Sequence, residues 1–381
     1  LLMHHTASCR GIFIRPMLEI KFIRENLQFV KDGARKKHIA VDLDALMTLD
    51  EKRRELTGAL EKKRAEQNQA SKVEFLAHAV GGPSQEERSK LIAEKLRPLK
   101  IEVQKIEDEL KEVLTEWRRL MILVPNIPDM SVLEGESEED NKEIKNWGEK
   151  PKFDFEPKGH VELMTALGMA DFERGAKVHG FRGYFLQNDG ALLSFAIWNY
   201  ARDFFLKKNF MPFIAPAIIN KEHFFGTGHL PGDAQDVFQT QDEQYLAGTA
   251  EVPMMAYHAD EILAKEELPK RYLAFSPCYR REAGSYSKDV KGLIRVHEFY
   301  KWEQLILCEA SHETSAALHE ELNRNTEEFI ESLGIPYRQV VICTGDLKAA
   351  HVKSYDTELW IPKEEKYREI ASASYYHDFQ T

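Results

Sequence analysis

A long apolar seam constrains the fold of this chain more than any other feature of its sequence. Apolar residues recur at alternating spacings of four and three, and the set comprises Ile92, Leu96, Leu99, Val103, Ile106, Leu110, Val113, Trp117, Leu120 and Val124. This spacing predicts an α-helix whose apolar stripe packs against a second helix, as in a coiled coil.

The second helix is predicted upstream, from about residue 42 to residue 80. This segment lacks proline and keeps the same register at Leu46, Leu49, Leu56 and Leu60, before its seam turns polar at Lys63 and Gln67. The stretch "GGPSQEE" at 81–87 predicts a turn, with Ser84 as the N-cap of the next helix. Two long helices joined by a tight turn pack antiparallel, so we expect an arm of roughly 60 Å that kinks at Pro98.

Two functions are open for this arm. Its seam alone suits a dimerisation or spacer coiled coil. Its basic side chains suit a probe for a phosphate backbone, and they are Lys52, Arg53, Arg54, Lys62, Lys63, Arg64, Lys72, Arg88 and Lys90. The net charge of −11 argues against general coating of nucleic acid, although a local basic patch on an acidic protein can still bind RNA.

Beyond the arm the composition changes twice. Residues 125–157 are rich in proline and acidic residues, which predicts a linker. From residue 158 to 381, strand-like and helical stretches alternate, and several strands follow one another around hairpins. This arrangement predicts an α+β fold in which helices flank an antiparallel β-sheet. We interpret residues 1–16 as an upstream extension, because "MLEIKFIREN" at Met17 reads like a true start.

Several protein classes lack support in this sequence. No run of 18 apolar residues is present, so we expect no membrane span. Neither G-x-G-x-x-G nor a P-loop pattern is present, so the common nucleotide-binding folds are not indicated. The four cysteines form no C-x-x-C pair, and we expect reduced thiols in a cytoplasmic protein.

One predicted hairpin combines charged and aromatic residues in a way that suggests a ligand site. It reads "CYRREAGSYSKDVKGLIRVHEFYKWEQ" over residues 278–304. Because side chains alternate along a strand, we expect Arg280 and Glu282 on one face, and Arg295 and Phe299 together on the return strand. A guanidinium binds phosphate in a planar fork and a carboxylate accepts from an exocyclic amine, so the set suits a nucleotide. A surface hairpin with cross-strand ion pairs explains the same spacing.

The full pattern resembles motif 2 of the class II aminoacyl-tRNA synthetases, in the form typical of seryl-tRNA synthetases. Further stretches resemble the same family: "GTAEVP" (248–253) its serine-recognition loop, "FMPFIAPAII" (210–219) with Pro216 its dimer-forming motif 1, and "SYDTELWIPKEEKYREIASASYYHDFQ" (354–380) the stretch before motif 3. The antiparallel arm at 42–124, followed by "VPNIP", resembles the family's tRNA-binding domain, which implies an arm domain over 17–124 and a catalytic domain over 158–381.

The resemblance implies an enzyme that joins L-serine to tRNA(Ser) through a seryl-adenylate. Arg280 corresponds to the catalytic arginine on the α-phosphate of ATP. The implied serine-binding residues are Thr249, Ala250, Glu251 and Glu303. The implied ATP-binding residues are Arg280, Arg281, Glu282, Arg295, Phe299, Glu369, Ile370, Ala371 and Ser372. Glu369 and Ser372 are also the implied ligands of Mg²⁺, which prefers hard oxygen donors.

The resemblance further implies a cytoplasmic homodimer that forms through the region around Pro216 and binds tRNA(Ser) with its arm. The family pattern continues past "DFQ" into a segment that carries motif 3, so we expect that the chain is truncated at Thr381 and is a poor enzyme. A non-catalytic, tRNA- or partner-binding relative of the synthetases is therefore the alternative. Ala371 stands where the family has serine, and we expect a mild effect because Ser372 remains.

Overall fold

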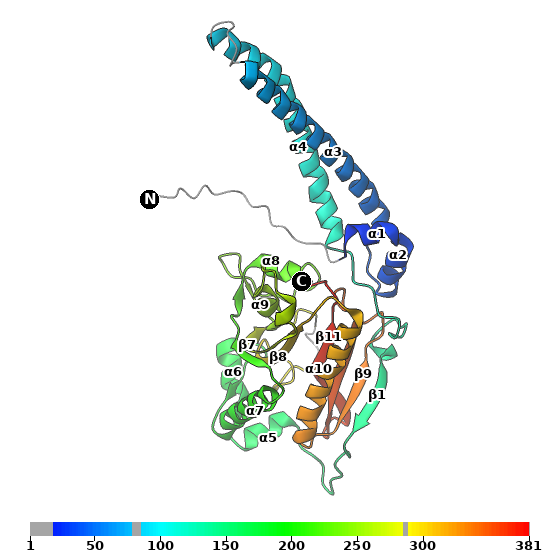
Figure 1. The fold of residues 1–381 in the computed structure, drawn as a ribbon. Coiled ribbons are helices and arrows are strands. Elements are labelled where there is room, and N and C mark those ends of the chain that lie inside the picture. Colours follow the sequence, from blue (N-terminus) through cyan, green and yellow to red (C-terminus); the bar gives the residue numbers. More distant parts are fainter. Residues whose placement is uncertain (1–17, 78–84, 285–288, 381) are drawn as a thin grey trace. The chain divides into compact units, whose positions relative to one another are not determined.

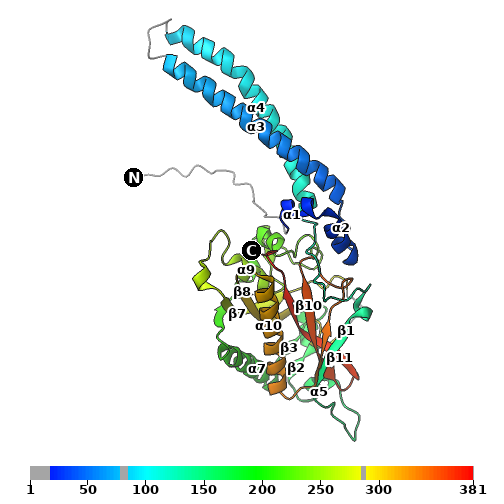
Figure 2. The same ribbon diagram turned by 45° about the vertical axis from the view of Figure 1, so that its right-hand side comes forward.

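The computed structural model describes residues 18–77, 85–284 and 289–380, with side chains for these residues except 71–95. The predicted turn and its N-cap Ser84 lie outside the described residues. The chain divides into two compact units (Figures 1 and 2). We call them the arm unit (residues 19–31 and 40–124) and the sheet unit (residues 32–39 and 125 onward). Within the described ranges, no helix has the length and apolar character needed to cross a membrane.

The helices and strands follow in chain order. The first part of the chain forms α1 (Ile20–Glu25), α2 (Leu27–Lys36), α3 (Leu43–Ala77) and α4 (Gln85–Met121). The middle part forms β1 (Lys142–Trp147), α5 (His160–Ala166), β2 (Ala170–Asp171), α6 (Phe172–His179), β3 (Phe185–Leu186), α7 (Asp189–Leu206), β4 (Met211–Ile214), β5 (Ile218–Ile219), α8 (Lys221–Gly226), β6 (Tyr245–Leu246) and α9 (Glu251–Ala256). The last part forms β7 (Lys270–Tyr279), β8 (Glu298–Leu307), α10 (His312–Ser332), β9 (Tyr337–Val341), β10 (Lys353–Ile361) and β11 (Lys366–Tyr375), with short 3₁₀ turns at Glu138–Asp140 and Lys265–Glu267.

The arm unit confirms the predicted pair of long helices. Helices α3 and α4 run side by side along the arm (Figure 1). The carboxylate of Asp42 accepts the N–H of Ala45 at 2.9 Å and so caps the start of α3. The predicted seam of α4 is buried at Val103, Val113 and Leu120. Helix α4 continues through Pro98, and a kink there stays a prediction.

Ion pairs between α3 and α4 use several of the basic residues of the arm. Lys52 pairs with Glu109 at 2.8 Å, and Lys63 with Glu102 at 2.8 Å. Arg53 donates instead to the fully buried carboxylate of Asp50 at 2.8 Å. These cations therefore stabilise the helix pair as well as adding positive charge to its surface.

The sheet unit contains two main sheets. One is antiparallel with the order β1-β9-β10-β11, and the other has the order β4-β7-β8, in which β4 is parallel to β7 and β7 antiparallel to β8. Helix α10 packs against β10, β11 and α7, beginning where the hydroxyl of Ser311 accepts the N–H of Thr314. The result confirms the predicted α+β class, with helices flanking largely antiparallel sheet.

The segment 125–157, for which a linker was predicted, carries a strand of the larger sheet. Strand β1 pairs antiparallel with β9 in the register Lys142↔Val341 and Trp147↔Tyr337. The ring of Trp147 stacks on that of Tyr337 with centroids 5.8 Å apart. Cross-strand aromatic packing of this kind is not visible in a composition rich in proline and acidic residues.

Candidate active site

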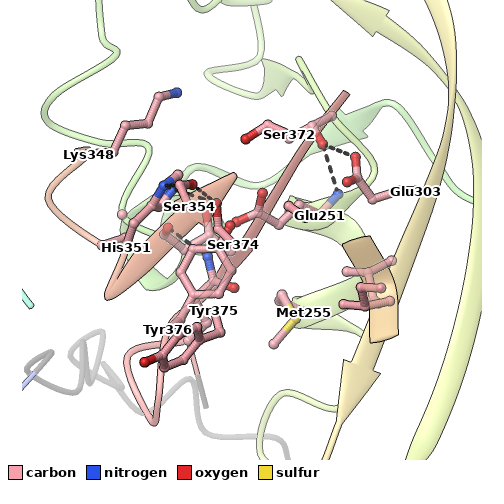
Figure 3. A pocket seen from close by; sticks show the side chains of 18 of the residues that line it. Glu251, Met255, Glu303, Lys348, His351, Ser354, Ser372, Ser374, Tyr375 and Tyr376 are labelled. Carbon is pink, nitrogen blue, oxygen red and sulfur yellow. Dashed lines mark hydrogen bonds between the residues drawn. The ribbon is translucent and has the colours of Figure 1, made fainter. Parts of the chain in front are cut away.

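A large cavity of about 3130 Å³ lies in the sheet unit and brings most of the predicted site residues together. Figure 3 shows three of them, Glu251, Glu303 and Ser372, among the residues that line it. The predicted residues that line it are Thr249, Glu251, Arg280, Glu282, Arg295, Phe299, Glu303, Glu369, Ile370, Ala371 and Ser372. They come from the start of α9, from β8 and the loop before it, and from β11. Residues that were predicted from separate stretches of the sequence thus line the same cavity.

The other two predicted residues lie differently. Ala250 is 0% exposed and packs in the apolar core with Met254 and Ala274. Arg281 is exposed, and its backbone N–H donates to the carbonyl of Asp236 at 2.8 Å. Ala250 can therefore support the residues of the site from the core. Arg281 fixes the loop that follows β7 through its backbone N–H.

The prediction that Glu282 and Arg295 lie on regular strands is wrong, and Arg280 lies one residue beyond the end of β7. Strand β7 ends at Tyr279 and β8 begins at Glu298. Glu282 has a φ of 53°, in the left-handed region that a strand does not use. The reason is a competing partner for the backbone, because the N–H groups of Arg281 and Ala283 donate to Asp236 rather than to the return strand.

Arg280 is held beside the aromatic ring expected to stack on a base. Its backbone N–H donates to the carbonyl of His297 at 3.0 Å, which extends the β7–β8 pairing by one residue. Its guanidinium lies 5.3 Å from the centre of the Phe299 ring, and its Nε donates to the carbonyl of Gly248 at 3.3 Å. A cation over an aromatic face leaves the remaining N–H groups of the guanidinium for a phosphate or carboxylate.

Opposite charges in the same cavity hold Arg295 in place. Its Nη1 donates to Oε2 of Glu282 at 2.5 Å. Asp289 lies 4.0 Å from Arg295 and also pairs with Arg368 at 3.0 Å. A highly charged ligand such as a polyphosphate could exchange these carboxylates for its own oxygens on the two guanidinium groups.

A second cluster surrounds Thr249 and Glu303. The hydroxyl of Thr249 donates to Oε2 of Glu303 at 2.6 Å. The ammonium of Lys301 lies 3.3 Å from the same carboxylate and 3.4 Å from the Thr249 hydroxyl. Glu303 lies on β8 opposite the small residue Ala274. The cluster can bind a ligand that carries both a cation and a hydroxyl.

Glu251 adds a further carboxylate to this cluster from the first turn of α9. Its backbone N–H donates to the Thr249 hydroxyl at 3.3 Å, and its Oε1 accepts Nε2 of Gln380 at 2.5 Å. Burial raises the pKa of Tyr376 well above its usual value, and the charges of Glu251 and Glu303 add to this effect. Burial likewise lowers the pKa of His229, although the charge of Glu251 opposes this effect. The phenol of Tyr376 and the imidazole of His229 thus both favour their neutral forms beside this cluster.

A β-bulge places Glu369 and Ser372 on the same face of the sheet. Residues three apart in a regular strand point to opposite faces. Ala371 is opposite Thr357, but Glu369 is opposite Glu358, so Ile370 is the extra residue in β11. The inserted residue reverses the alternation and brings the Glu369 carboxylate to the side that carries Ser372.

The surroundings of Glu369 suit a hard cation. Asp356 lies opposite Ser372, and burial together with the charge of Glu369 raises its pKa to about 7. Crowded carboxylates of this kind are relieved by a cation, and Mg²⁺ commonly takes one or two protein carboxylates and fills its other positions with phosphate and water. A ready-made cluster of three or more His, Cys, Asp or Glu ligands is not found in the described part of the chain.

Sequence reasoning missed Asp289, which lies beside Arg295 and pairs with Arg368, as well as Arg368 itself and three further residues of the site. Lys301 belongs to the Thr249 cluster, Asp356 adjoins Glu369, and Gln380 holds Glu251. Lys301 has the same strand parity as Phe299 and Glu303, so alternation alone could have identified it. Asp356 and Gln380 come close only through long-range pairing, which leaves no local sequence signal.

Comparisons with known proteins agree on one family. Residues 17–128 match the seryl-tRNA synthetase N-terminal domain, and residues 236–381 match the class II tRNA synthetase core domain for G, H, P, S and T. The chain is 42% identical to the serine–tRNA ligase of Deinococcus radiodurans, over 96% of this chain and 84% of that protein. It is 41% identical to the enzyme of the same name from Thermodesulfovibrio yellowstonii, over 96% of this chain and 85% of that protein.

A solved structure supports the same relationship. The seryl-tRNA synthetase of Pyrococcus horikoshii, crystallised with ATP, aligns with a TM-score of 0.83 and 34% identity, over 95% of this chain and 85% of that one. With two matching domains and relatives that extend over nearly the whole sequence, the chain belongs to the seryl-tRNA synthetase family.

Proposed function

We propose that this protein attaches L-serine to tRNA(Ser) in two steps, using ATP to form a seryl-adenylate. The observation that carries the proposal is the cluster at the start of α9, where the Thr249 hydroxyl donates to Glu303 at 2.6 Å and Glu251 lies within the same cavity. The family relationship and the convergence of the motif residues on one cavity support it further. The Thr249 cluster, the family relationship and the shared cavity do not favour a non-catalytic role.

Serine fits the Thr249 cluster through both of its polar ends. Glu251 and Glu303 would surround the ammonium group, and Thr249 would exchange hydrogen bonds with the substrate. In this role Lys301 would offset part of the negative charge beside Glu303, from which it lies 3.3 Å. A site built to hydrogen-bond a hydroxyl discriminates strongly against the analogue that lacks it, because the unpaired polar groups remain buried.

ATP would bind beside the serine. Arg280 would bind the α-phosphate and the serine carboxylate. Phe299 would lie against the adenine ring, and Glu282 would accept a hydrogen bond from the adenine amine. Arg295 would turn from Glu282 to the γ-phosphate. The serine carboxylate then attacks the α-phosphorus in line and pyrophosphate leaves, so that positioning and charge neutralisation provide the acceleration. The seryl group passes from the adenylate to the terminal adenosine of the tRNA.

Glu369 and Ser372 would hold a Mg²⁺ ion between the phosphates, where the ion would neutralise their charge. We predict that Glu369→Gln raises the Mg²⁺ concentration needed for half-maximal activity by about tenfold or more. The measurement is a Mg²⁺ titration of pyrophosphate exchange at saturating serine and ATP. Glu365→Gln, at an exposed position after β10, is the matched control and should leave the titration unchanged. If the Mg²⁺ titration curves of the two variants were superimposable, the assignment of Glu369 as a metal ligand would be contradicted.

The arm unit would bind tRNA(Ser), through the phosphate backbone and the shape of the RNA. Arg54 and Lys62 are exposed on α3 and are available to phosphates. The reaction would take place in the cytoplasm.

A homodimer would form around Pro216. Strand β4 lies at the edge of its sheet, and near it Met211, Ile214 and Ile218 are 58%, 87% and 56% exposed. An exposed apolar edge strand tends to pair with another chain. A second copy of the same strand region would bury these side chains.

We predict that Ile214→Asp weakens the dimer at least about thirtyfold, because a buried interface residue typically costs ~2 kcal/mol when disrupted. Analytical ultracentrifugation over a concentration series measures the change. Ile262→Asp is the control, since Ile262 is 100% exposed and lies in the segment after α9 rather than on β4. An unchanged dimer in the Ile214 variant would place the interface elsewhere.

Serine-dependent exchange of pyrophosphate into ATP tests the proposed activity, with alanine, threonine and proline measured in parallel. We expect kcat/KM for serine to exceed that for alanine by at least about a thousandfold. Exchange that depends on none of these amino acids, together with intact tRNA binding, would favour the non-catalytic alternative. Exchange with threonine or proline in preference to serine would assign the site to another class II enzyme.

A further inference from the structure

A buried lysine from the N-terminal part of the chain belongs to the sheet unit. Lys37 follows α2 in the segment 32–39, and its side chain is only 4% exposed. Its ammonium donates to the carbonyl oxygens of Lys348 at 3.0 Å, Ala349 at 3.0 Å and His351 at 2.5 Å. Three donors meet three acceptors, so the charged form of the side chain is fully satisfied.

We infer that Lys37 is a positioning residue of the proposed serine site, and that it acts by fixing the loop 348–351 against the residues that hold Glu251. This inference rests on the proposed function, because it takes Glu251 to bind serine. It concerns how the shape of that site is maintained by a residue that does not touch the substrate.

Burying a charged ammonium group costs free energy, so the buried position of Lys37 needs compensating interactions. Removal from water disfavours the charged form and lowers the pKa of Lys37 to about 7. The three carbonyls compensate this cost only when the loop keeps the conformation that points them at one nitrogen. The lysine and the loop therefore stabilise each other's geometry.

Asn126 holds the same loop from another direction. Its backbone N–H donates to the carbonyl of Ala349 at 2.9 Å, and its Nδ2 donates to Ala350 at 3.1 Å and to Tyr376 at 2.7 Å. The loop is thus tied to the segment that follows β11. That segment carries Phe379 and Gln380 towards the site.

Close packing links this loop to Glu251. Ala350 and Phe379 are both 5% exposed and form one apolar cluster. A Cβ added to Gly228 would lie 2.7 Å from the Phe379 ring and 3.2 Å from Ala350. Gly228, Phe379 and Ala350 are therefore closely packed, with no space for an added methyl group. Gln380, the next residue, donates to the carbonyl of Thr227 at 3.1 Å and to Glu251 at 2.5 Å. A shift of the loop would move Phe379 and hence the amide that orients Glu251.

His351 also links the loop to β11, which carries the proposed Mg²⁺ ligands Glu369 and Ser372. Its Nδ1 lies 3.1 Å from the hydroxyls of both Ser354 and Ser374. Ser374 is two residues beyond Ser372 on β11 and so lies on the same face. If the route through Phe379 dominates, loss of Lys37 would weaken mainly the binding of serine. If the route through Ser374 dominates, it would weaken the binding of serine and of Mg²⁺ equally. The contact of Phe379 with Ala350 and Gly228, and the direct hydrogen bond from Gln380 to Glu251, favour the first route.

The test compares Lys37→Met with Lys36→Met in the whole chain. Lys36 is the adjacent, half-exposed lysine, and its partner is Glu134. We expect Lys37→Met to raise KM for serine about tenfold or more in pyrophosphate exchange while KM for ATP changes less than about twofold. Lys36→Met should change neither. Equal increases in both KM values, or no increase, would overturn the inference.

A double-mutant cycle with Gln380→Ala separates positioning from general destabilisation. If Lys37 acts through Gln380, the double variant should have nearly the serine KM of the Gln380 variant alone. Multiplicative effects would show that the two residues act independently and would overturn the inference. Lys37→Arg repeats the cycle with the charge retained, so that the comparison does not depend on the stability of the methionine variant. If the wild-type protein showed no serine-dependent exchange, the proposed function itself would fail and the inference with it.

Discussion

Replacing Glu303 by alanine should abolish most of the serine affinity while leaving ATP binding nearly intact. The carboxylate accepts the Thr249 hydroxyl at 2.6 Å and lies 3.3 Å from Lys301. Removing one member of a buried, hydrogen-bonded charge pair costs about 2–5 kcal/mol, which is roughly 30- to 5,000-fold in kcat/KM for serine. Pyrophosphate exchange at varied serine and varied ATP measures both constants.

Two further variants define what the alanine change removes. Glu303→Gln keeps the size of the side chain, so an effect that persists in it is due to the lost charge. Glu266→Ala, at an exposed position before β7, controls for the general loss of an acidic residue. A loss of the same size for serine and ATP in the Glu303 variants would contradict the assignment of Glu303 to the amino acid.

Shortening the arm should separate the two steps of the reaction. We propose to replace residues 65–101 by a short glycine turn, which keeps the buried base of the arm at Leu46, Asp50 and Leu120. The sheet unit has its own core, so serine activation should stay within about twofold of the full-length protein. Charging of tRNA should fall by at least about a hundredfold, because the phosphate contacts of the distal arm are lost.

The control for the shortened arm is a variant that keeps the arm and reverses charge on its surface. Arg54→Glu with Lys62→Glu should also reduce tRNA charging, and the loss should shrink as salt concentration rises. If shortening the arm abolished serine activation as well, the arm would be part of the activating site. If both variants charged tRNA normally, the coiled coil would serve as a spacer.

The arm could be predicted from sequence because its stabilising contacts are periodic. A seam that repeats every seven residues identifies the buried face of α4, and Val103, Val113 and Leu120 are buried as expected. The prediction needs no knowledge of distant residues. The same is true of strands β7 and β8, whose alternation is visible in the hairpin sequence.

The details of the site could not be predicted in the same way. The bulge at Ile370 changes which face Glu369 occupies, although no residue type nearby demands it. The loop after Tyr279 leaves its strand because Asp236, more than 40 residues away, takes its N–H groups. The motif resemblance identified which residues gather in the cavity, and only the fold determines how they face one another.

The path of the chain through its two units has a consequence for how the protein is made. The contacts between α3 and α4 close over a short connection, so the arm can form while the rest of the chain is still on the ribosome. Lys37 is made before α3 and α4, yet its acceptor on His351 lies 314 residues later. At ~5–20 residues per second, roughly 15–60 seconds pass before that acceptor is synthesised. During this time the segment 32–39 must remain available, and the sheet unit can be completed only after the loop 348–351 has been synthesised.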